Sequence, residues 1–317
     1  MKGGKSMAAE LETMFYVREK PWHGLGTRVE AAPNSKEALK MAGLDWKVTQ
    51  EPVFTGSGKK ADCYLANVRS TDHQILGIVS DKYRVIQNDE AFEFTDSLLG
   101  QGVRYETAGS LFGGRRVWIL ARLPREYIIA GEKISPYLVF SNSHDGSGAI
   151  RVAVTPIRVV CNNTLNLALH NARRSWSMIH KGDIKGKIQE AREALFHADD
   201  YMLQLSREFE RLNKTQVSDR QVSEYIDRLI PMDEKPTPIQ KKNVLKLREG
   251  IKERYYNAPD LKSLKGTAYR LINAVSDFAT HGEPLRKTAN YRENLFARTV
   301  DGHPMIDRAY QMLQAAA

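Results

Sequence analysis

Hydrophobic and polar positions alternate with a period of two through much of the first half of the chain, which is typical of half-buried β-strands. The segment from Ala149 to Thr155 shows it most clearly, with Ile150 and Val154 on one face and Arg151 on the other. Short turns separate it from earlier segments of similar pattern, so we expect an antiparallel sheet. These earlier expected strands cover residues 45–55, 61–70, 74–80, 103–110, 115–123 and 134–143.

Two helices interrupt this strand series. The first is expected over residues 35–43, with Ser35 as its cap and Gly43 as its stop. The second begins near Asn88 and ends at Gly100, because its apolar residues recur with a period of 3.6. The first half therefore predicts a sheet with flanking helices.

A turn of small and polar residues, His144 to Gly148, precedes the Ala149–Thr155 strand. Aspartate accepts local backbone hydrogen bonds and glycine permits positive φ, so this composition favours a tight turn. Pro156 cannot donate to a sheet ladder, and the strand either ends there or lies at an edge. An apolar run follows, after which Asn162 or Asn163 can cap a further helix.

The second half changes to a helical period. The helical pattern is preceded by a basic stretch with two glycines, residues 173–187, and it is interrupted by a proline-rich stretch, residues 231–238. The fold class is thus α+β, with an N-terminal antiparallel sheet and a C-terminal helical domain. We expect a disordered lead-in over 1–10, a sheet domain over 11–175, a basic linker over 176–187 and a helical domain over 188–317. The expected helices of that domain cover 188–212, 218–229, 239–256, 263–280 and 305–313.

Composition is that of a globular protein with a basic balance. The 317 residues are 42% hydrophobic and carry a net charge of +9, which favours nucleic acid or another anionic partner. The only cysteines, Cys63 and Cys161, are far apart in sequence, so buried thiols in a reducing cytoplasm are expected rather than a disulfide. There is no secretory signal and no apolar run long enough for a membrane span.

Most of the positive charge is concentrated in the middle of the chain. Residues 146–187 hold seven basic residues and one acid, a net charge of +6. Such a segment favours an anion-binding surface, but a solvated strand face that continues into a basic linker explains it equally well. The basic residues of this segment are Arg151, Arg158, Arg173, Arg174, Lys181, Lys185 and Lys187.

Two glycine-rich turns carry further basic residues. Gly56 to Lys60 lacks the spacing of a phosphate-binding loop and is expected as a hairpin tip that presents Lys59 and Lys60. A second tip, at Gly113-Gly114, presents Arg115 and Arg116. Either tip is placed to touch a phosphate backbone.

Sequence motifs of catalysis are absent. The histidines are scattered, and the sequence contains neither the paired-cysteine nor the paired-histidine spacing of metal sites. His144 and Asp145 are candidates for half of a site, although a turn role for Asp145 is the more common use. The sequence gives no positive reason to expect an enzyme, a metal or a cofactor.

Trp176 lies between Arg174 and His180. Aromatic residues interleaved with basic ones stack on unpaired bases in many nucleic-acid-binding proteins. The alternative is that Trp176 pins the linker onto the helical domain, and both interpretations stay open.

Several segments resemble a family of uncharacterised proteins carried by phages and plasmids, described as a domain of unknown function. The most specific is Thr155–Leu165; Pro21–Gly26, Leu76–Tyr83 and Gly266–Val275 match more weakly, and Tyr269 stands where the family pattern has tryptophan. The resemblance implies a bacterial host and a mobile element, but no catalytic residues. The order of three strands and a helix is also similar to single-strand annealing recombinases, which act without a nucleotide cofactor and often as rings.

Together these observations predict a cytoplasmic protein that binds single-stranded DNA, as a possible homo-oligomer, in recombination or replication. Asn162 or Asn163 would add hydrogen bonds and Trp176 would stack on bases, while the basic residues hold phosphates. One alternative is a protein-interaction or anti-defence module whose basic surface meets an acidic partner. Another is a metal-dependent nuclease built from His144, Asp145 and distant carboxylates.

Overall fold

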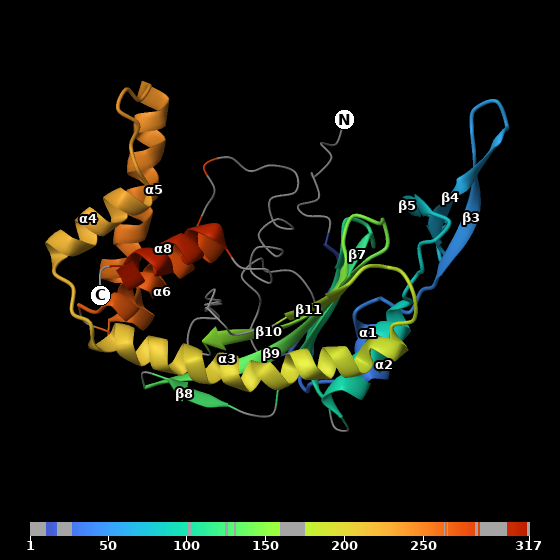
Figure 1. Cartoon of the computed structure of the whole chain (residues 1–317), viewed down its shortest axis with the longest axis horizontal. Coiled ribbons are helices and arrows are strands. Elements are labelled where there is room, and N and C mark those ends of the chain that lie inside the picture. Colours follow the sequence, from blue (N-terminus) through green and yellow to red (C-terminus); the bar gives the residue numbers. More distant parts are fainter. Residues whose placement is uncertain are drawn as a thin grey trace, which may run out of the picture. The chain divides into compact units, whose positions relative to one another are not determined.

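The fold is described from a computed structural model (Figure 1), in which the contacts between residues divide the chain into two compact units. The sheet unit consists of Met1–Pro124, Tyr137–Val154 and Arg174–His197, and the helical unit of Arg125–Pro136, Thr155–Arg173 and Ala198–Ala317. The structure describes residues 11–17, 27–100, 103–123, 126–129, 131–158, 175–262, 264, 266–282, 285 and 303–315.

The larger sheet has the strand order β11-β10-β9-β7-β6-β1-β2, and β8 pairs with β9 off this path. Its ladders are antiparallel where the register is described, except for a short parallel pair between β1 and β2. The strands are β1 (Leu11–Tyr16), β2 (Thr27–Arg28), β6 (Tyr105–Leu111), β7 (Arg116–Arg122), β8 (Tyr127–Ile129), β9 (Glu132–Ser143), β10 (Ile150–Arg158) and β11 (Ser175–Met178).

A second sheet of three strands forms an antiparallel meander, β3-β4-β5, as the sequence predicts. It comprises β3 (Val48–Phe54), β4 (Lys60–Arg69) and β5 (Ile75–Ser80). Along β5, Leu76 and Val79 are buried, whereas Ile75 and Ile78 are about half exposed.

Helices α1 (Ser35–Met41) and α2 (Asn88–Leu99) form the core of the sheet unit with residues of the larger sheet. The cap of α1 is Asn34 rather than the predicted Ser35, because the Asn34 side chain accepts the amide hydrogen of Glu37. Helix α2 ends at Gly100, which adopts the positive φ that its stop role requires. The aromatic packing of this core includes Phe92 against Tyr105, with ring centroids 5.1 Å apart.

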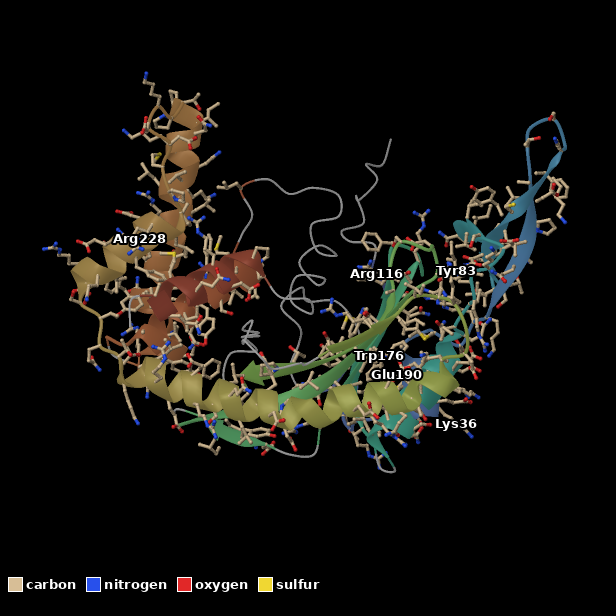
Figure 2. All side chains as sticks on the ribbon, in the orientation of Figure 1. Lys36, Tyr83, Arg116, Trp176, Glu190 and Arg228 are labelled. Atoms are coloured by element: carbon tan, nitrogen blue, oxygen red, sulfur yellow. The ribbon has the colours of Figure 1, made fainter. Side chains whose placement is uncertain are left out.

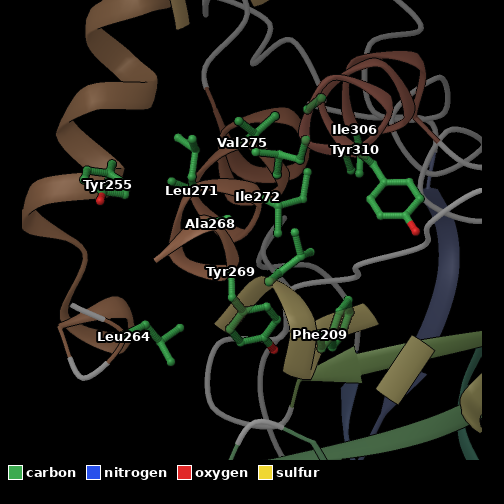
Figure 3. Close-up of a cluster of buried hydrophobic side chains, with 14 of the residues drawn as sticks. Phe209, Tyr255, Leu264, Ala268, Tyr269, Leu271, Ile272, Val275, Ile306 and Tyr310 are labelled. Atoms are coloured by element: carbon green, nitrogen blue, oxygen red, sulfur yellow. The ribbon is translucent and has the colours of Figure 1, made fainter. Parts of the chain in front are cut away.

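The helical unit is built from long amphipathic helices around a single apolar cluster. Figure 3 shows this cluster, in which the rings of Phe209 and Tyr269 approach to 4.9 Å between centroids. None of the helices in the described ranges combines the length and apolar character needed to cross a membrane. The helices are α3 (Ile188–Lys214, which begins in the sheet unit), α4 (Asp219–Leu229), α5 (Pro238–Asn257), α6 (Ala268–His281) and α8 (Pro304–Ala315).

The predicted fold class is confirmed, with sheets in the N-terminal half and helices mostly in the C-terminal half. The prediction that the strand ends at Pro156 is wrong, because β10 continues to Arg158. Its partner β11 pairs only with Ile150–Ala153, so Pro156 lies beyond that ladder and its missing amide hydrogen breaks no bond there. The alternative of an edge position fits this arrangement.

The basic linker predicted over 176–187 is wrong for its first residues. Ser175–Met178 forms β11, because Trp176 and Met178 add apolar side chains to the core of the sheet unit. Residues 185–187 form a short 3₁₀ helix that leads into α3. Strands β1, β2 and β8 were not predicted, and the predicted lead-in and the helix after Asn162 or Asn163 lie outside the described residues.

Candidate functional site

The β3–β4 hairpin extends beyond the third strand of its sheet, as Figure 1 shows. Strand β5 pairs only with Tyr64–Val68, so the hairpin from Phe54 to Cys63 has two strands. Its turn is closed by Thr55, whose amide donates to the Lys59 carbonyl at 2.8 Å, and Gly58 supplies a positive φ. The predicted hairpin tip is thus confirmed.

Aromatic and cationic side chains lie on this projecting hairpin and at its base, where Tyr64 is the first residue of β4 to pair with β5. The side chains of Phe54 and Tyr64 are 59% and 54% exposed, although burial of such rings is normally favourable. Lys59 and Lys60 are exposed and form no ion pair within the described residues, and Lys60 is the cross-strand partner of Phe54. The hairpin therefore presents positive charge beside two aromatic side chains that are more than half exposed to solvent.

The sequence analysis missed both aromatic residues of this hairpin. Phe54 directly precedes the glycine-rich turn, and Tyr64 stands out of phase with the inward-facing Leu65. An aromatic residue in the polar phase of an alternating strand is the signal that could have indicated them.

The outer face of the three-stranded sheet continues this apolar surface. Ile78 is paired across the strands with Ala66, and Ile75 with Val68. Ile75 and Ile78 are 55% and 50% exposed, whereas Ala66 and Val68 between them are buried. Two exposed apolar residues three positions apart on the same strand, β5, favour a contact surface here.

The second predicted hairpin tip joins β6 to β7. Its glycines, Gly113 and Gly114, have φ values of 64° and 87°, and they allow a turn that residues with a side chain rarely adopt. Arg115 is exposed, whereas Arg116 is half-buried on β7 opposite Ser143 (Figure 2). A guanidinium nitrogen of Arg116 lies beside Gly148, 3.4 Å from where a Cβ of that residue would stand.

The basic residues predicted in the middle of the chain occupy several positions. Arg151 lies on β10 opposite Ser177, and Arg158 is the last residue of that strand. Lys181, Lys185 and Lys187 are exposed in the segment after β11. The remaining predicted residues, Asn162, Asn163, Arg173 and Arg174, lie outside the described residues.

Two of these lysines have carboxylate partners. The ammonium group of Lys185 lies 3.6 Å from Glu93 of α2, and Lys187 pairs with Glu190. Lys187, together with Trp176, donates to Glu190 and lowers the pKa of that carboxyl group. The charge available to an anion is therefore smaller here than the sequence predicts.

Trp176 packs within the sheet unit, where it also donates to Glu190 near the start of α3, so the interpretation of it as a contact to the helical segment stays a prediction. Its ring stacks on Phe94 of α2 with centroids 5.9 Å apart, and it is half-buried. Trp176 and Glu190 are labelled in Figure 2. Because one ring face already meets Phe94, Trp176 is less accessible for base stacking than the hairpin aromatics.

A cluster of buried polar side chains joins the two sheets of the sheet unit. His144 is fully buried, and its Nε2 donates to Oδ1 of Asn88, whose Nδ2 in turn donates to the Leu44 carbonyl. The carbonyl of His144 accepts Nδ2 of Asn67 from β4 at 2.6 Å. Hydrogen bonds of His144 thus connect the turn after β9 both to α2 and to the three-stranded sheet.

A second buried histidine, His180, lies in the same cluster. Its Nε2 donates to Oδ1 of Asn142 at 2.6 Å, and its ring stacks on Tyr83 with centroids 4.5 Å apart. The Tyr83 hydroxyl donates to the Ser143 carbonyl, and burial followed by the charge of Asp145 raises the pKa of that hydroxyl. Tyr83 is labelled in Figure 2.

Burial decides the charge state of both histidines. It is the main cause that lowers the pKa of His144 to about 3 and that of His180 to about 4, with the Asp145 carboxylate acting in the opposite direction. Both rings are therefore neutral at pH 7. They donate fixed hydrogen bonds between segments, which is a positioning role rather than that of a general base tuned to neutral pH.

Asp145 fulfils the predicted turn role. Its Oδ1 accepts the amide hydrogen of Ser147 at 2.9 Å, and Gly146 has a φ of 76°. The turn is held tightly against β5, because a Cβ on Gly77 would stand only 2.4 Å from the Asp145 Cα. Within the described ranges, no group of three or more histidine, cysteine, aspartate or glutamate side chains is placed to hold a metal ion.

Fold and site together define an α+β protein with a protruding aromatic and cationic hairpin and a separate helical unit. A family model described as "Domain of unknown function (DUF932)" matches residues 75–301. Because this match covers more than half of the sequence, the chain belongs to that family. No curated protein and no solved structure matches it.

Proposed function

We propose that this protein binds single-stranded DNA and promotes its annealing in the recombination or replication of a phage or plasmid within a bacterial host. The observation that carries the proposal is the β3–β4 hairpin, where exposed Phe54 and Tyr64 accompany Lys59 and Lys60. Stacking on aromatic rings and charge neutralisation by lysines are the two contacts that single-strand binding uses.

The aromatic residues favour single strands over a duplex. A base is free to stack on a side chain only when it is not already stacked within a helix. Each base–aromatic contact contributes about 1–3 kcal/mol. Lysine contacts to phosphates contribute equally for every base sequence, so binding without sequence preference is expected.

Other basic residues of the sheet unit extend the electrostatic surface. Arg115 is exposed at the β6–β7 turn, and Lys181 is exposed after β11. Lys185 and Lys187 contribute less, because Glu93 and Glu190 already neutralise them. The proposal therefore assigns the main contact to the hairpin.

Fluorescence anisotropy of a labelled oligothymidylate, measured at low and at raised salt, tests the proposal. Wild-type protein should bind at low salt and weaken steeply as salt rises, because binding releases counterions. Phe54→Ala combined with Tyr64→Ala should raise the Kd at least about tenfold, since two stacking contacts are removed. Annealing of two complementary strands should slow in parallel.

The matched control is Lys36→Gln combined with Lys40→Gln on α1. Both lysines are exposed and lie outside the hairpin, so their loss should leave the affinity nearly unchanged. The absence of binding at low salt, or equal loss in the control and the hairpin variant, would remove the proposal.

A second candidate function is a protein-interaction or anti-defence module of a mobile element. The exposed pair Ile75 and Ile78 favours it, because apolar side chains gain more from a protein partner than from a phosphate backbone. Ile78→Ser should abolish capture of such a partner after nuclease treatment while leaving DNA binding intact.

A further inference from the structure

The first half of α5 packs only partly against the rest of the helical unit. Its buried residues, Ile251 and Tyr255, both lie in the second half of the helix. In the first half, Ile239 is 73% exposed and Leu245 is 49% exposed. Val244 and Leu247 pack, partly buried, against the apolar cluster of the helical unit, and the remaining surface of this segment is open to solvent.

Three lysines, Lys241, Lys242 and Lys246, lie on this exposed segment, and no acidic residue accompanies them between Pro238 and Lys246. All three are exposed and form no ion pair within the part of the chain that the structure describes. The arginines of the same helix behave differently: Arg248 pairs with Asp227 at 2.9 Å and Arg254 with Asp277 at 2.8 Å.

The lysines do not serve the stability of the helix. Positive charge near a helix N-terminus opposes the helix dipole, and Lys242 and Lys246 are a like-charged pair one turn apart. Helices α1 to α4 all carry an acidic residue in the first turn, whereas α5 carries none. The helix starts despite these charges because Thr237 and Gln240 form a capping box.

The distribution of apolar residues on α5 argues against a partner helix as the occupant. Ile239 and Leu245 lie about 120° apart around the helix axis, since each residue turns by about 100°. They form no continuous stripe of the kind that an amphipathic partner would need. The three lysines lie on the same side of the helix within about 140° and are interleaved with Ile239 and Leu245, so this side is a mixed surface in which positive charge predominates.

We infer that the first half of α5 is a second nucleic-acid contact, on the helical unit, in which Lys241, Lys242 and Lys246 hold the phosphate backbone. The inference rests on the proposed nucleic-acid-binding function and adds a contact separate from the hairpin. From Lys241 to Lys246 the helix rises about 8 Å, a length over which a DNA duplex carries several phosphates. Since the segment has no exposed aromatic ring, it should bind duplex and single strands alike.

The test compares three full-length proteins on two probes, an oligothymidylate and a duplex of about 30 base pairs. The proteins are the wild type, the α5 variant K241Q/K242Q/K246Q and the hairpin variant F54A/Y64A. Loss of three phosphate contacts should lower the slope of log K against log salt by about 2 to 3 on both probes. Between about 50 and 200 mM salt, the fall in affinity should therefore be smaller than that of the wild type by a factor of about 20 on the oligothymidylate and about 40 on the duplex.

The hairpin variant should lose affinity for the oligothymidylate only. The control for the α5 variant is K36Q/K40Q/K82Q, which removes the same charge from exposed positions of the sheet unit. Circular dichroism should show that the α5 variant keeps its helix content, because glutamine is also a good helix former.

Each outcome separates the two claims. If the α5 variant has the same salt dependence of affinity as the control on both probes, while the wild type binds single strands more tightly than the duplex, the α5 contact is refuted and the hairpin proposal stands. If duplex binding depends on α5 but the hairpin variant loses nothing, the proposed single-strand function is refuted and the α5 contact stands. If neither probe binds at low salt, both are refuted.

Discussion

The two buried histidines should make the stability of the sheet unit depend steeply on pH. Asn88, the edge of the Trp46 ring, His180 and the Asp145 carboxylate face His144. Tyr83, Asn142 and Asp145 face His180. Burial lowers the pKa of both rings in the folded protein, so the unfolded chain takes up protons first as the pH falls.

The magnitude follows from the difference in proton uptake. An unfolded histidine has a pKa of about 6.5, so at pH 5 each one stabilises the unfolded chain by about 2 kcal/mol. The folded pKa values of about 3 and about 4 lie below pH 5, so the native state gains almost nothing in return. The free energy of unfolding of the sheet unit should therefore fall by about 4 kcal/mol between pH 8 and pH 5, whereas a typical domain has a total of about 5–15 kcal/mol.

Urea unfolding followed by tryptophan fluorescence at pH 8 and pH 5 measures this loss. Trp46, Trp118 and Trp176 all belong to the sheet unit, so the signal reports on that unit. His144→Gln and His180→Gln each lower stability at pH 8 through lost packing. Each variant should nevertheless show a difference in unfolding free energy between pH 8 and pH 5 that is about 2 kcal/mol smaller than that of the wild type, because one titrating group is gone.

The control is His73→Asn, which removes an exposed histidine from a position of positive φ that asparagine tolerates. It should leave the difference between pH 8 and pH 5 intact. The assignment of buried neutral rings would be refuted if the unfolding free energy of the wild type differed by less than about 1 kcal/mol between pH 8 and pH 5. It would also be refuted if neither glutamine variant changed that difference.

Three further predictions concern packing and capping. Gly77→Ala would place a Cβ 2.4 Å from the Asp145 Cα and should cost at least about 2 kcal/mol, read from the urea midpoint of tryptophan fluorescence; an unchanged midpoint contradicts it. Phe209→Ala removes a fully buried ring beside Tyr269 and should cost about 3–5 kcal/mol in the helical unit, measured by ellipticity at 222 nm; a loss below about 1 kcal/mol would contradict the packing. Thr237→Ala removes the cap of α5 and should cost about 1 kcal/mol, visible as faster hydrogen exchange in its first turns, with the later turns of the same helix as the internal reference.

Periodicity predicted the regular elements of this fold closely. The apolar phase of residues 239–256 anticipated α5 to within a residue at each end, and the glycine stops at Gly43 and Gly100 fell where the helices finish. Short strands such as β2 and β8 escaped prediction, because two or three residues cannot establish a period. β11 escaped because its basic surroundings indicated a linker.

The candidate site was harder to predict because its members meet only through tertiary structure. His180 was not predicted as part of a buried cluster, since nothing local shows that its ring stacks on Tyr83 and that Asn142 accepts a hydrogen bond from its Nε2. The hairpin lysines were predicted from the glycine-rich turn, whereas the exposure of Phe54 depends on where β5 ends. Local sequence reports what a residue is able to do, and tertiary structure decides whether it remains accessible.

The helical unit includes a strand pair that comes from far upstream in the chain. Tyr127 of β8 and Ile134 of β9 lie in the apolar cluster of the helices, and the Tyr127 hydroxyl donates to Asp199 at 2.6 Å. A fragment that begins at α3 would consequently expose apolar side chains of the helices and lose the hydrogen bond from Tyr127 to Asp199. If the two units are expressed separately, residues 125–136 should therefore be kept with the helices, for example by joining them to α3 through a short linker.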